Sequence, residues 1–365
     1  MMGSGTVLAV ARACGHIGVG IDIDPLAVLL ARVWTTAVDV SKAERKAAEI
    51  LNRAKSDFAS RRAREAYPRY ADSETRKFIR YWFDQYSRRQ LTSLAEAIHG
   101  VRDTQIRDAL WCAFSRLIIT KQSGASLAMD LSHSRPHKAF DHAPIEPFDK
   151  FIAAVNQVLK NCIRANQRDR GPATSATLGD ARKLPIASGT IDLVLTSPPY
   201  LNAIDYMRCS KFSLVWMGYS IEELSGIRTE SVGTESGDQE ASDSEGIQKI
   251  ITDLKLSPEL SARNESVLAH YIEDMRNSIK EAERVLSPGG KAVYVVGENT
   301  VRGTFIPNAK IVSAVAKLSG LRADGRRARE LPANRRYLPP PTARNAPDAL
   351  DGRMRREVIL TFSKP

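Results

Sequence analysis

Residues 191–200 read Ile-Asp-Leu-Val-Leu-Thr-Ser-Pro-Pro-Tyr. Aliphatic residues dominate positions 191–195, a pattern typical of a strand buried on both faces of a parallel sheet. Pro198 and Pro199 then end the strand, because each proline lacks a backbone N–H and fixes φ. We therefore predict a stiff loop at the carboxyl end of a strand, which is where ligands bind in open α/β sheets.

The predicted loop carries groups that suit a planar base with an exocyclic amine. Ser197 supplies a hydroxyl, Tyr200 supplies an aromatic face, and the Ser-Pro-Pro backbone supplies carbonyls that no local N–H consumes. The two protons of an amine can be accepted by a hydroxyl and a carbonyl while the ring stacks on the tyrosine. A base in a duplex would first have to be flipped out, at a cost of roughly a few kcal/mol. A proline-rich turn that merely ends a strand is the alternative.

The tetrapeptide resembles the catalytic motif of the DNA amino-methyltransferases, Asp/Asn/Ser-Pro-Pro-Tyr/Phe. The serine form resembles the cytosine N4 subgroup, although both cytosine and adenine pair an exocyclic amine with a ring-nitrogen acceptor. The resemblance implies a catalytic set of Ser197, Pro198, Pro199 and Tyr200.

The chain opens on a glycine loop, Gly3-Ser4-Gly5-Thr6, followed by an apolar helical stretch and a strand that ends at Asp22. Glycines let a ligand approach the backbone closely, and an acid at the end of the strand can accept ribose hydroxyls. Leu8 stands where a dinucleotide fingerprint has its third glycine, and no lysine makes a phosphate-binding loop. The pattern predicts a ligand with a ribose and no phosphate cradle, which fits S-adenosylmethionine.

This opening resembles the cofactor motif of the same methyltransferases, with a methionine in place of the usual aromatic residue. Asp22 is the predicted ribose ligand, and Asp24 is the second candidate. Asp180, after a predicted third strand at 176–180, corresponds to a residue that contacts the adenine in the family; a turn-capping role is the alternative. The cofactor-binding residues implied are Gly3, Ser4, Gly5, Thr6, Asp22 and Asp180.

Composition restricts the class of protein. A chain of 365 residues exceeds the roughly 250 to 300 that one core supports, so more than one structural part is expected. Lys plus Arg number 53 against 42 Asp plus Glu, a net charge of +11 that favours a polyanionic partner such as DNA, with RNA less favoured. Scattered cysteines and the lack of a leader or a membrane-spanning run fit a reducing cytoplasm. Pro136 separates His133 from His137, so we expect no metal site.

The fold class expected is α/β, a doubly wound Rossmann-like methyltransferase sheet with a large helical insertion. Residues 1–40 and 168–365 would form the catalytic domain, and 41–167 the insertion, a candidate for target recognition. Helices are expected at 25–36, 43–66, 73–99, 104–120 and 147–165. Cations gather on this segment where a nucleic-acid backbone could lie, with a solvated helical face as the alternative; they are Arg61, Arg62, Arg64, Arg69, Arg76, Lys77, Arg80, Arg88 and Arg89.

The C-terminal part combines an acidic segment with further sheet elements. Residues 229–246 are acidic and poor in apolar side chains, which predicts a loop that is mobile until substrate binds. A helix capped by Asn264 or Ser266 should stop at residues 287–290, Ser-Pro-Gly-Gly, before a strand at 291–297. Leu-x-Pro-Gly-Gly at this place resembles S-adenosylmethionine-dependent methyltransferases generally. A helix at 306–318, an arginine-rich loop and a strand at 356–362 complete the chain.

The resemblance implies direct transfer of a methyl group from S-adenosylmethionine to the exocyclic amine of a flipped DNA base, most simply cytosine N4, in a restriction-modification setting. Alternatives are an adenine-N6 DNA methyltransferase, a guanine-N2 RNA methyltransferase and a catalytically inactive nucleic-acid-binding remnant. The family also has a strand before the glycine loop, in the centre of the sheet. We expect either a start upstream of Met1, which we favour, or a strand supplied by another segment or chain, or a damaged protein.

Overall fold

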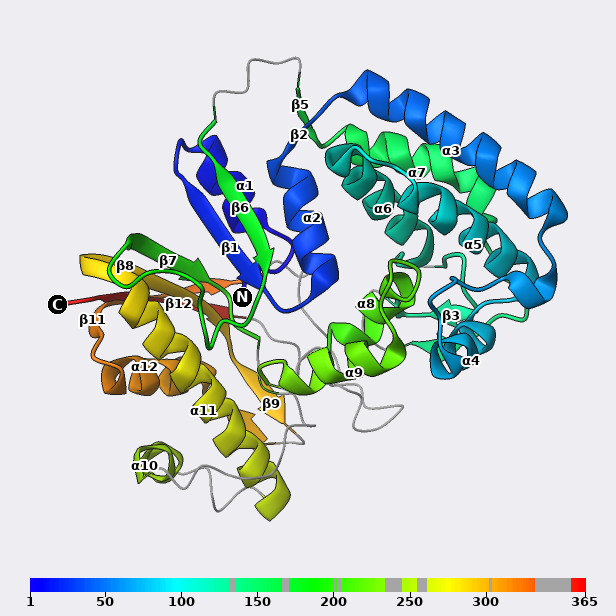
Figure 1. The fold of residues 1–365 in the computed structure, drawn as a ribbon. Coiled ribbons are helices and arrows are strands. Elements are labelled where there is room, and N and C mark those ends of the chain that lie inside the picture. The colour runs from blue at the N-terminus through cyan, green and yellow to red at the C-terminus, as the bar shows by residue number, and fades with distance from the viewer. Residues whose placement is uncertain are drawn as a thin grey trace. The chain divides into compact units, whose positions relative to one another are not determined.

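The computed structural model describes residues 1–121, 123–131, 136–165, 171–199, 201, 205–233, 245–254, 261–301, 304–331 and 356–365. The chain divides into two compact units. The N-terminal unit comprises residues 2–178 and 205–228, and the C-terminal unit comprises residues 1, 179–204 and 229–365. The first strand and its flanking helices, drawn in blue in Figure 1, belong to the same unit as the segment 41–167.

A parallel strand pair and two helices open the N-terminal unit. The elements are α1 (Thr6–Ala13), β1 (Gly18–Asp22), α2 (Pro25–Thr35) and β6 (Thr174–Leu178). β1 and β6 pair in parallel, with Gly18 opposite Thr174 and Asp22 opposite Leu178. The predicted helix at 25–36 is confirmed, because Pro25 occupies its first turn and the Asp24 side chain accepts from Leu26 N at 2.8 Å.

Helices make up most of the remaining N-terminal unit. They are α3 (Val40–Ser60), a short 3₁₀ turn (Ala63–Glu65), α4 (Ser73–Trp82), α5 (Gln85–His99), α6 (Thr104–Ile118), α7 (Pro147–Leu159), α8 (Met207–Leu214) and α9 (Ile221–Glu230), with minor strands β2 (Ala37–Val38), β3 (Ala128–Met129), β4 (His137–Lys138) and β5 (Ile163–Arg164). Most of these helices share one apolar core around Phe83, Phe114, Phe151 and Trp216. None of the described helices is long and apolar enough to cross a membrane.

Three of the helices expected in this unit have clearly different bounds. The helix expected at 43–66 is α3, which begins at Val40 and ends at Ser60, and a separate 3₁₀ turn follows it. The stretch 73–99 is two helices, because Asp84 adopts an extended conformation and caps α5 by accepting from Ser87 N at 2.9 Å. The last predicted helix of the segment ends at Leu159, earlier than residue 165, and Ile163 already pairs with Ala37 in a parallel strand contact.

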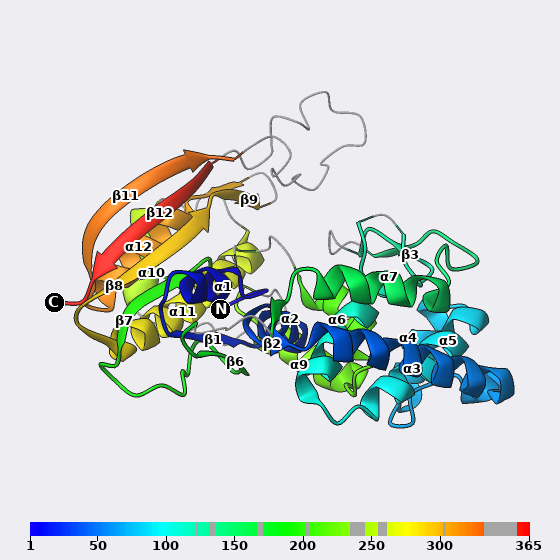
Figure 2. The same ribbon diagram turned by 90° about the horizontal axis from the view of Figure 1, so that it is seen from above.

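A four-stranded sheet forms the framework of the C-terminal unit, in the order β11-β12-β8-β7. Its elements are β7 (Ile191–Thr196), α10 (Glu245–Asp253), α11 (Ala262–Val285), β8 (Leu286–Gly297), β9 (Asn299–Val301), β10 (Thr304–Ile306), α12 (Asn308–Leu318), β11 (Arg322–Glu330) and β12 (Arg356–Ser363). β7 and β8 are parallel, whereas β12 is antiparallel to both its neighbours. Helices α10, α11 and α12 cover one face of the sheet, and their apolar side chains share its core (Figure 2). The expected α/β class is confirmed.

β7 is less buried than its sequence predicts. It lies at the edge of the four-stranded sheet, and Leu193 and Leu195 are 53% and 39% exposed, so the expectation of a strand covered on both faces was wrong. In the N-terminal unit, β6 is the only strand paired with β1 among the described residues, and Val19 of β1 is 49% exposed. β7 and β1 therefore each have one edge without a strand partner in the described structure.

Three other expectations for the C-terminal unit change. The arginine-rich stretch 322–330 is strand β11, because it pairs along its length with β12. α11 is capped by Ser261, whose side chain accepts from Asn264 N, and so begins earlier than predicted. β8 already begins at Leu286, and Gly289 takes a φ of 75° within the Pro-Gly-Gly turn. Most of the acidic segment (234–244) and the arginine-rich loop 332–355 lie outside the described residues.

Candidate functional site

The Ser-Pro-Pro loop follows β7 directly, as predicted, and is fixed to the next strand. The Ser197 hydroxyl donates to the Val295 carbonyl of β8 at 2.9 Å. Pro198 is buried, while Ser197 is exposed. Since the hydroxyl proton is engaged by Val295, the oxygen presents lone pairs that can accept hydrogen bonds from a ligand.

The Pro199 carbonyl is also engaged. The Tyr271 hydroxyl of α11 donates to it at 3.2 Å, and the Tyr271 side chain is almost completely buried. The sequence analysis considered only local N–H donors for the carbonyls of this loop, and here a distant helix supplies a donor where the local backbone does not. A carbonyl oxygen has two lone pairs, so one acceptor position remains at Pro199. Tyr200 lies outside the described residues, and its assigned role stays a prediction.

The glycine loop shows why small residues are needed at its two glycines. Gly3 and Gly5 have φ values of 59° and 83°, a region that favours glycine. A side chain at Gly5 would meet Ala31 of α2 at 2.6 Å, whereas the equivalent position at Gly3 faces open space. Gly5 thus permits close packing on α2, and Gly3 leaves the backbone accessible. Ser4 is exposed and Thr6 begins α1.

Asp22 ends β1 beside the glycine loop. One of its carboxylate oxygens accepts from Met2 N at 2.9 Å and from Gly3 N at 2.7 Å, and the other accepts from Asp24 N at 3.1 Å. The carboxylate thereby ties the strand end to the loop. A carboxylate can accept about four hydrogen bonds, so Asp22 retains capacity for a ligand hydroxyl.

Asp24, the second ribose candidate, has a structural role. It caps α2 and accepts from the Ser210 hydroxyl at 2.6 Å. Burial raises the pKa of Asp24, although the hydrogen bonds from Ser210 and Leu26 oppose the shift. Both Asp24 oxygens already accept hydrogen bonds, one from Leu26 N and one from the Ser210 hydroxyl, which leaves Asp22 the better candidate for the ribose.

Asp180 is held by an arginine that the sequence analysis did not single out. Arg182 donates to both Asp180 oxygens, with N–O distances of 2.7 to 3.1 Å, and reaches Asp274 Oδ1 at 2.6 Å. The Asp274 side chain is 4% exposed, and burial raises its pKa while Arg182 opposes this shift. Asp180 lies in the C-terminal unit with Ser197, Pro198 and Pro199, whereas Gly3, Gly5 and Asp22 come together in the N-terminal unit.

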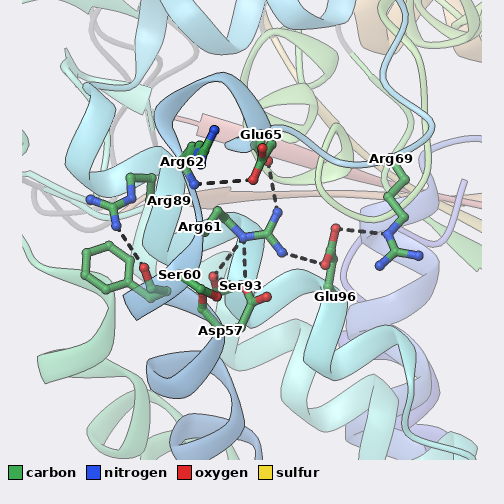
Figure 3. Close-up of polar contacts among 10 residues, drawn as sticks. Asp57, Ser60, Arg61, Arg62, Glu65, Arg69, Arg89, Ser93 and Glu96 are labelled. Carbon is green, nitrogen blue, oxygen red and sulfur yellow. Dashed lines mark hydrogen bonds and ion pairs between the residues drawn. The ribbon is translucent and has the colours of Figure 1, made fainter.

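Several of the cations expected to form a phosphate-binding helical face are structural. Arg61 is 9% exposed and pairs with Asp57 at 2.8 Å and with Glu96 at 2.6 Å (Figure 3). Arg89 donates to the Phe58 carbonyl at 2.8 Å and lies over the Phe58 ring.

Three further cations of this face cluster on one tyrosine. The buried Arg88 donates to the Tyr67 hydroxyl and packs over its ring, Arg80 donates to the same hydroxyl at 3.2 Å, and Arg76 lies 5.7 Å from the ring centroid. The sequence does contain a signal that these arginines have partners within the protein. Acidic and aromatic residues are interleaved with them, namely Asp57, Glu65, Tyr67 and Glu96.

The chain is similar to a methyltransferase. No family model matches it. It is 25% identical over 341 residues to the type II methyltransferase M.MvaI of Kocuria varians, a match that covers 87% of this chain and 73% of the relative. Similarity over most of both sequences supports common ancestry.

Solved structures give weaker matches. A candidate DNA modification methylase from Thermus thermophilus, also solved with S-adenosyl-L-methionine, superposes with a TM-score of 0.26 and 18% identity over 51% of each chain. A SAM-dependent methyltransferase from Methanosarcina mazei gives a TM-score of 0.26 and 10% identity, covering 59% of this chain and 77% of that one. The chain thus spans about half the length of the Thermus protein.

Proposed function

We propose that this protein is a DNA methyltransferase that uses S-adenosylmethionine and modifies the exocyclic amine of a flipped base, with cytosine N4 as the favoured target. The observation that carries the proposal is the hydrogen bond of Ser197, the residue directly after β7. Its hydroxyl donates to the Val295 carbonyl, so its oxygen can accept hydrogen bonds from a substrate. An amine needs such acceptors, because each hydrogen bond that it donates helps to localise the nitrogen lone pair for attack.

The other loop residues support the same chemistry. The buried Pro198 and the bond from Tyr271 to the Pro199 carbonyl hold the acceptors in one arrangement before substrate arrives. Rigid positioning of this kind lowers the barrier by removing the entropy cost of orienting the reacting groups. Tyr200, the next residue, would stack on the flipped base.

The residues at the glycine loop fit the cofactor. Open space at Gly3 leaves room for a ligand beside the backbone, and Asp22, which lies at hydrogen-bonding distance from Gly3 N, retains acceptor capacity for ribose hydroxyls. Gly3, Ser4, Gly5, Thr6 and Asp22 would hold S-adenosylmethionine there, and Asp180 is the proposed adenine contact. When bound, the cofactor supplies a methyl group on a positively charged sulfur.

The similarity to a type II methyltransferase supports DNA as the substrate and a restriction-modification role. We keep residues 41–167 as the proposed target-recognition segment of a catalytic domain formed by 1–40 and 168–365. Arg61, Arg88 and Arg89 form ion pairs or hydrogen bonds within the protein, so DNA contacts in this segment must come from other cations.

The test is transfer of a radiolabelled methyl group to DNA and, in parallel, to RNA, followed by hydrolysis of the product to nucleosides. We expect labelled N4-methylcytosine from DNA. Ser197→Ala should lose most turnover while cofactor affinity stays near that of the wild type, and Ser41→Ala, at an exposed serine on α3, is the matched control. Label in adenine would correct the base, label in RNA alone would overturn the substrate, and full turnover by Ser197→Ala would overturn the assignment of the site.

A further inference from the structure

Three cations line one cavity of the N-terminal unit. Arg208 and Lys211 come from α8 and Arg228 comes from α9, two helices labelled in Figure 1. With Pro136 these cations line a cavity of about 430 Å³. This volume is in the range of ligand sites, roughly 300 to 1,000 Å³. Among the described residues, the lining contains no aromatic side chain on which a base could stack, and its three cations suit an anionic group.

One carboxylate serves two of these cations. Asp205 Oδ2 lies 2.5 Å from Arg228 Nε and 3.1 Å from Arg208 Nε. The arginine side chains remain 40% and 52% exposed, whereas Asp205 is 23% exposed. Asp205 therefore orients both guanidinium groups while leaving each of them with further N–H donors toward solvent.

Lys211 has no carboxylate within ion-pair distance in the described part of the chain. Its ammonium lies 5.2 Å from the centroid of the Phe78 ring. Burial lowers the pKa of Lys211, the charges of Arg228 and Arg208 lower it further, and Asp205 only partly opposes them. Within the described part of the chain, three positive charges thus face one negative charge, and an added anion would relieve the repulsion among them.

We propose that Arg208, Lys211 and Arg228 bind a backbone phosphate of the DNA duplex, an inference that rests on the proposed function. A phosphodiester supplies the missing charge, and its oxygens accept the paired N–H donors of a guanidinium. The exposed arginines allow a polymer to reach the site from solvent. Such a contact orients the duplex without reading its sequence. Inorganic phosphate shares the chemistry, and the experiment distinguishes the two.

The test measures binding of the full chain to a labelled DNA duplex by fluorescence anisotropy over a series of salt concentrations, without cofactor. In Lys211→Gln and, separately, Arg208→Gln, we expect weaker binding at low salt and a plot of log K against log salt whose slope is smaller by about 0.9, the value for one lost phosphate contact. Lys55→Gln, at an exposed lysine of α3 that does not line the cavity, should keep the wild-type slope. Thermal melts establish that each variant is folded.

Each alternative outcome would overturn the proposal. Wild-type slopes in both cavity variants would exclude a phosphodiester contact. Stabilisation of the wild type but not of Lys211→Gln by inorganic phosphate, with an unchanged DNA slope, would identify a site for the free ion. A changed slope with duplex RNA alone would assign the other nucleic acid. Binding is measured without methyl transfer, so the two proposals can fail separately. If the protein binds DNA through this site but methylates no nucleic acid, the proposed function is disproved and the phosphate contact is supported.

Discussion

Replacement of Arg61 by alanine should destabilise the protein without affecting DNA binding. Arg61 is 9% exposed and contacts Asp57, Ser93, Glu96 and the Glu65 carbonyl (Figure 3). The variant would leave Asp57 and Glu96 without their shared cation in a partly buried place. Water that fills the space of the guanidinium would not restore its four oriented contacts with these residues.

The expected magnitude follows from exposure. Removal of one partner of a fully buried ion pair costs about 3 to 5 kcal/mol, whereas an exposed pair contributes about 0 to 1 kcal/mol. Arg61 is buried but Asp57 and Glu96 are 41% and 25% exposed, so solvent screens part of the loss. We expect Arg61→Ala to lower the free energy of unfolding by about 2 to 3 kcal/mol, between these limits.

Urea denaturation measures this change, which should lower the midpoint while leaving the slope of free energy against urea unchanged. Arg64→Ala is the matched control, because Arg64 is 73% exposed and should cost less than about 0.5 kcal/mol. DNA binding by Arg61→Ala should keep the wild-type salt dependence. Wild-type stability together with a salt slope smaller by about 0.9 would refute the structural role and restore Arg61 as a phosphate contact.

Gly5→Ala should lower stability by about 1 to 3 kcal/mol, because Gly5 has a φ of 83° and an added Cβ would overlap α2, whereas Gly226→Ala, in open space on α9, should be neutral or stabilising in the same thermal melts. Tyr271→Phe removes the donor to the Pro199 carbonyl, so kcat for methyl transfer should fall with little change in cofactor affinity; an unchanged kcat would contradict a positioning role for that bond. Burial raises the pKa of Asp57, but its hydrogen bonds with Arg61 and Ser93 outweigh this effect and hold the pKa below its usual value. The stability that Asp57 contributes is therefore present above the unfolded pKa of about 3.9 and is lost as the pH falls through the lower folded pKa. Asp57→Asn should destabilise the protein at pH 7 and not in strong acid. Urea titrations at both pH values measure this difference.

Local backbone chemistry explains which elements could be predicted from the sequence. Pro25 behind a capping Asp24 predicts the start of α2, and the paired prolines after Thr196 predict the end of β7, because each acts on its own backbone. The glycine loop before α1 could also be predicted from the sequence, because a positive φ value depends on the residue that adopts it.

Features that depend on distant partners could not be predicted in this way. The stretch 322–330 has few apolar residues and looks like a loop, yet it is a strand because β12 supplies its ladder. Arg61 looks like part of a basic surface until Glu96, which lies in another helix, pairs with it. The exposure of Leu193 likewise depends on the position of β7 at the edge of its sheet, and no property of residues 191–196 encodes that position.

The candidate site shows how both kinds of information combine. The sequence predicts that Ser197 and the Pro199 carbonyl stand together after a strand, but it contains nothing about their hydrogen bonds. In the structure Val295 accepts the Ser197 proton and Tyr271 donates to Pro199, so Ser197 presents only lone pairs and Pro199 keeps one. A pair of acceptors suits a group that donates two protons, such as a base amine, and would repel a carbonyl oxygen or an unprotonated ring nitrogen. The directions of these two bonds, which arise from β8 and α11, support our proposal that an exocyclic amine is the methylated group, whichever base carries it.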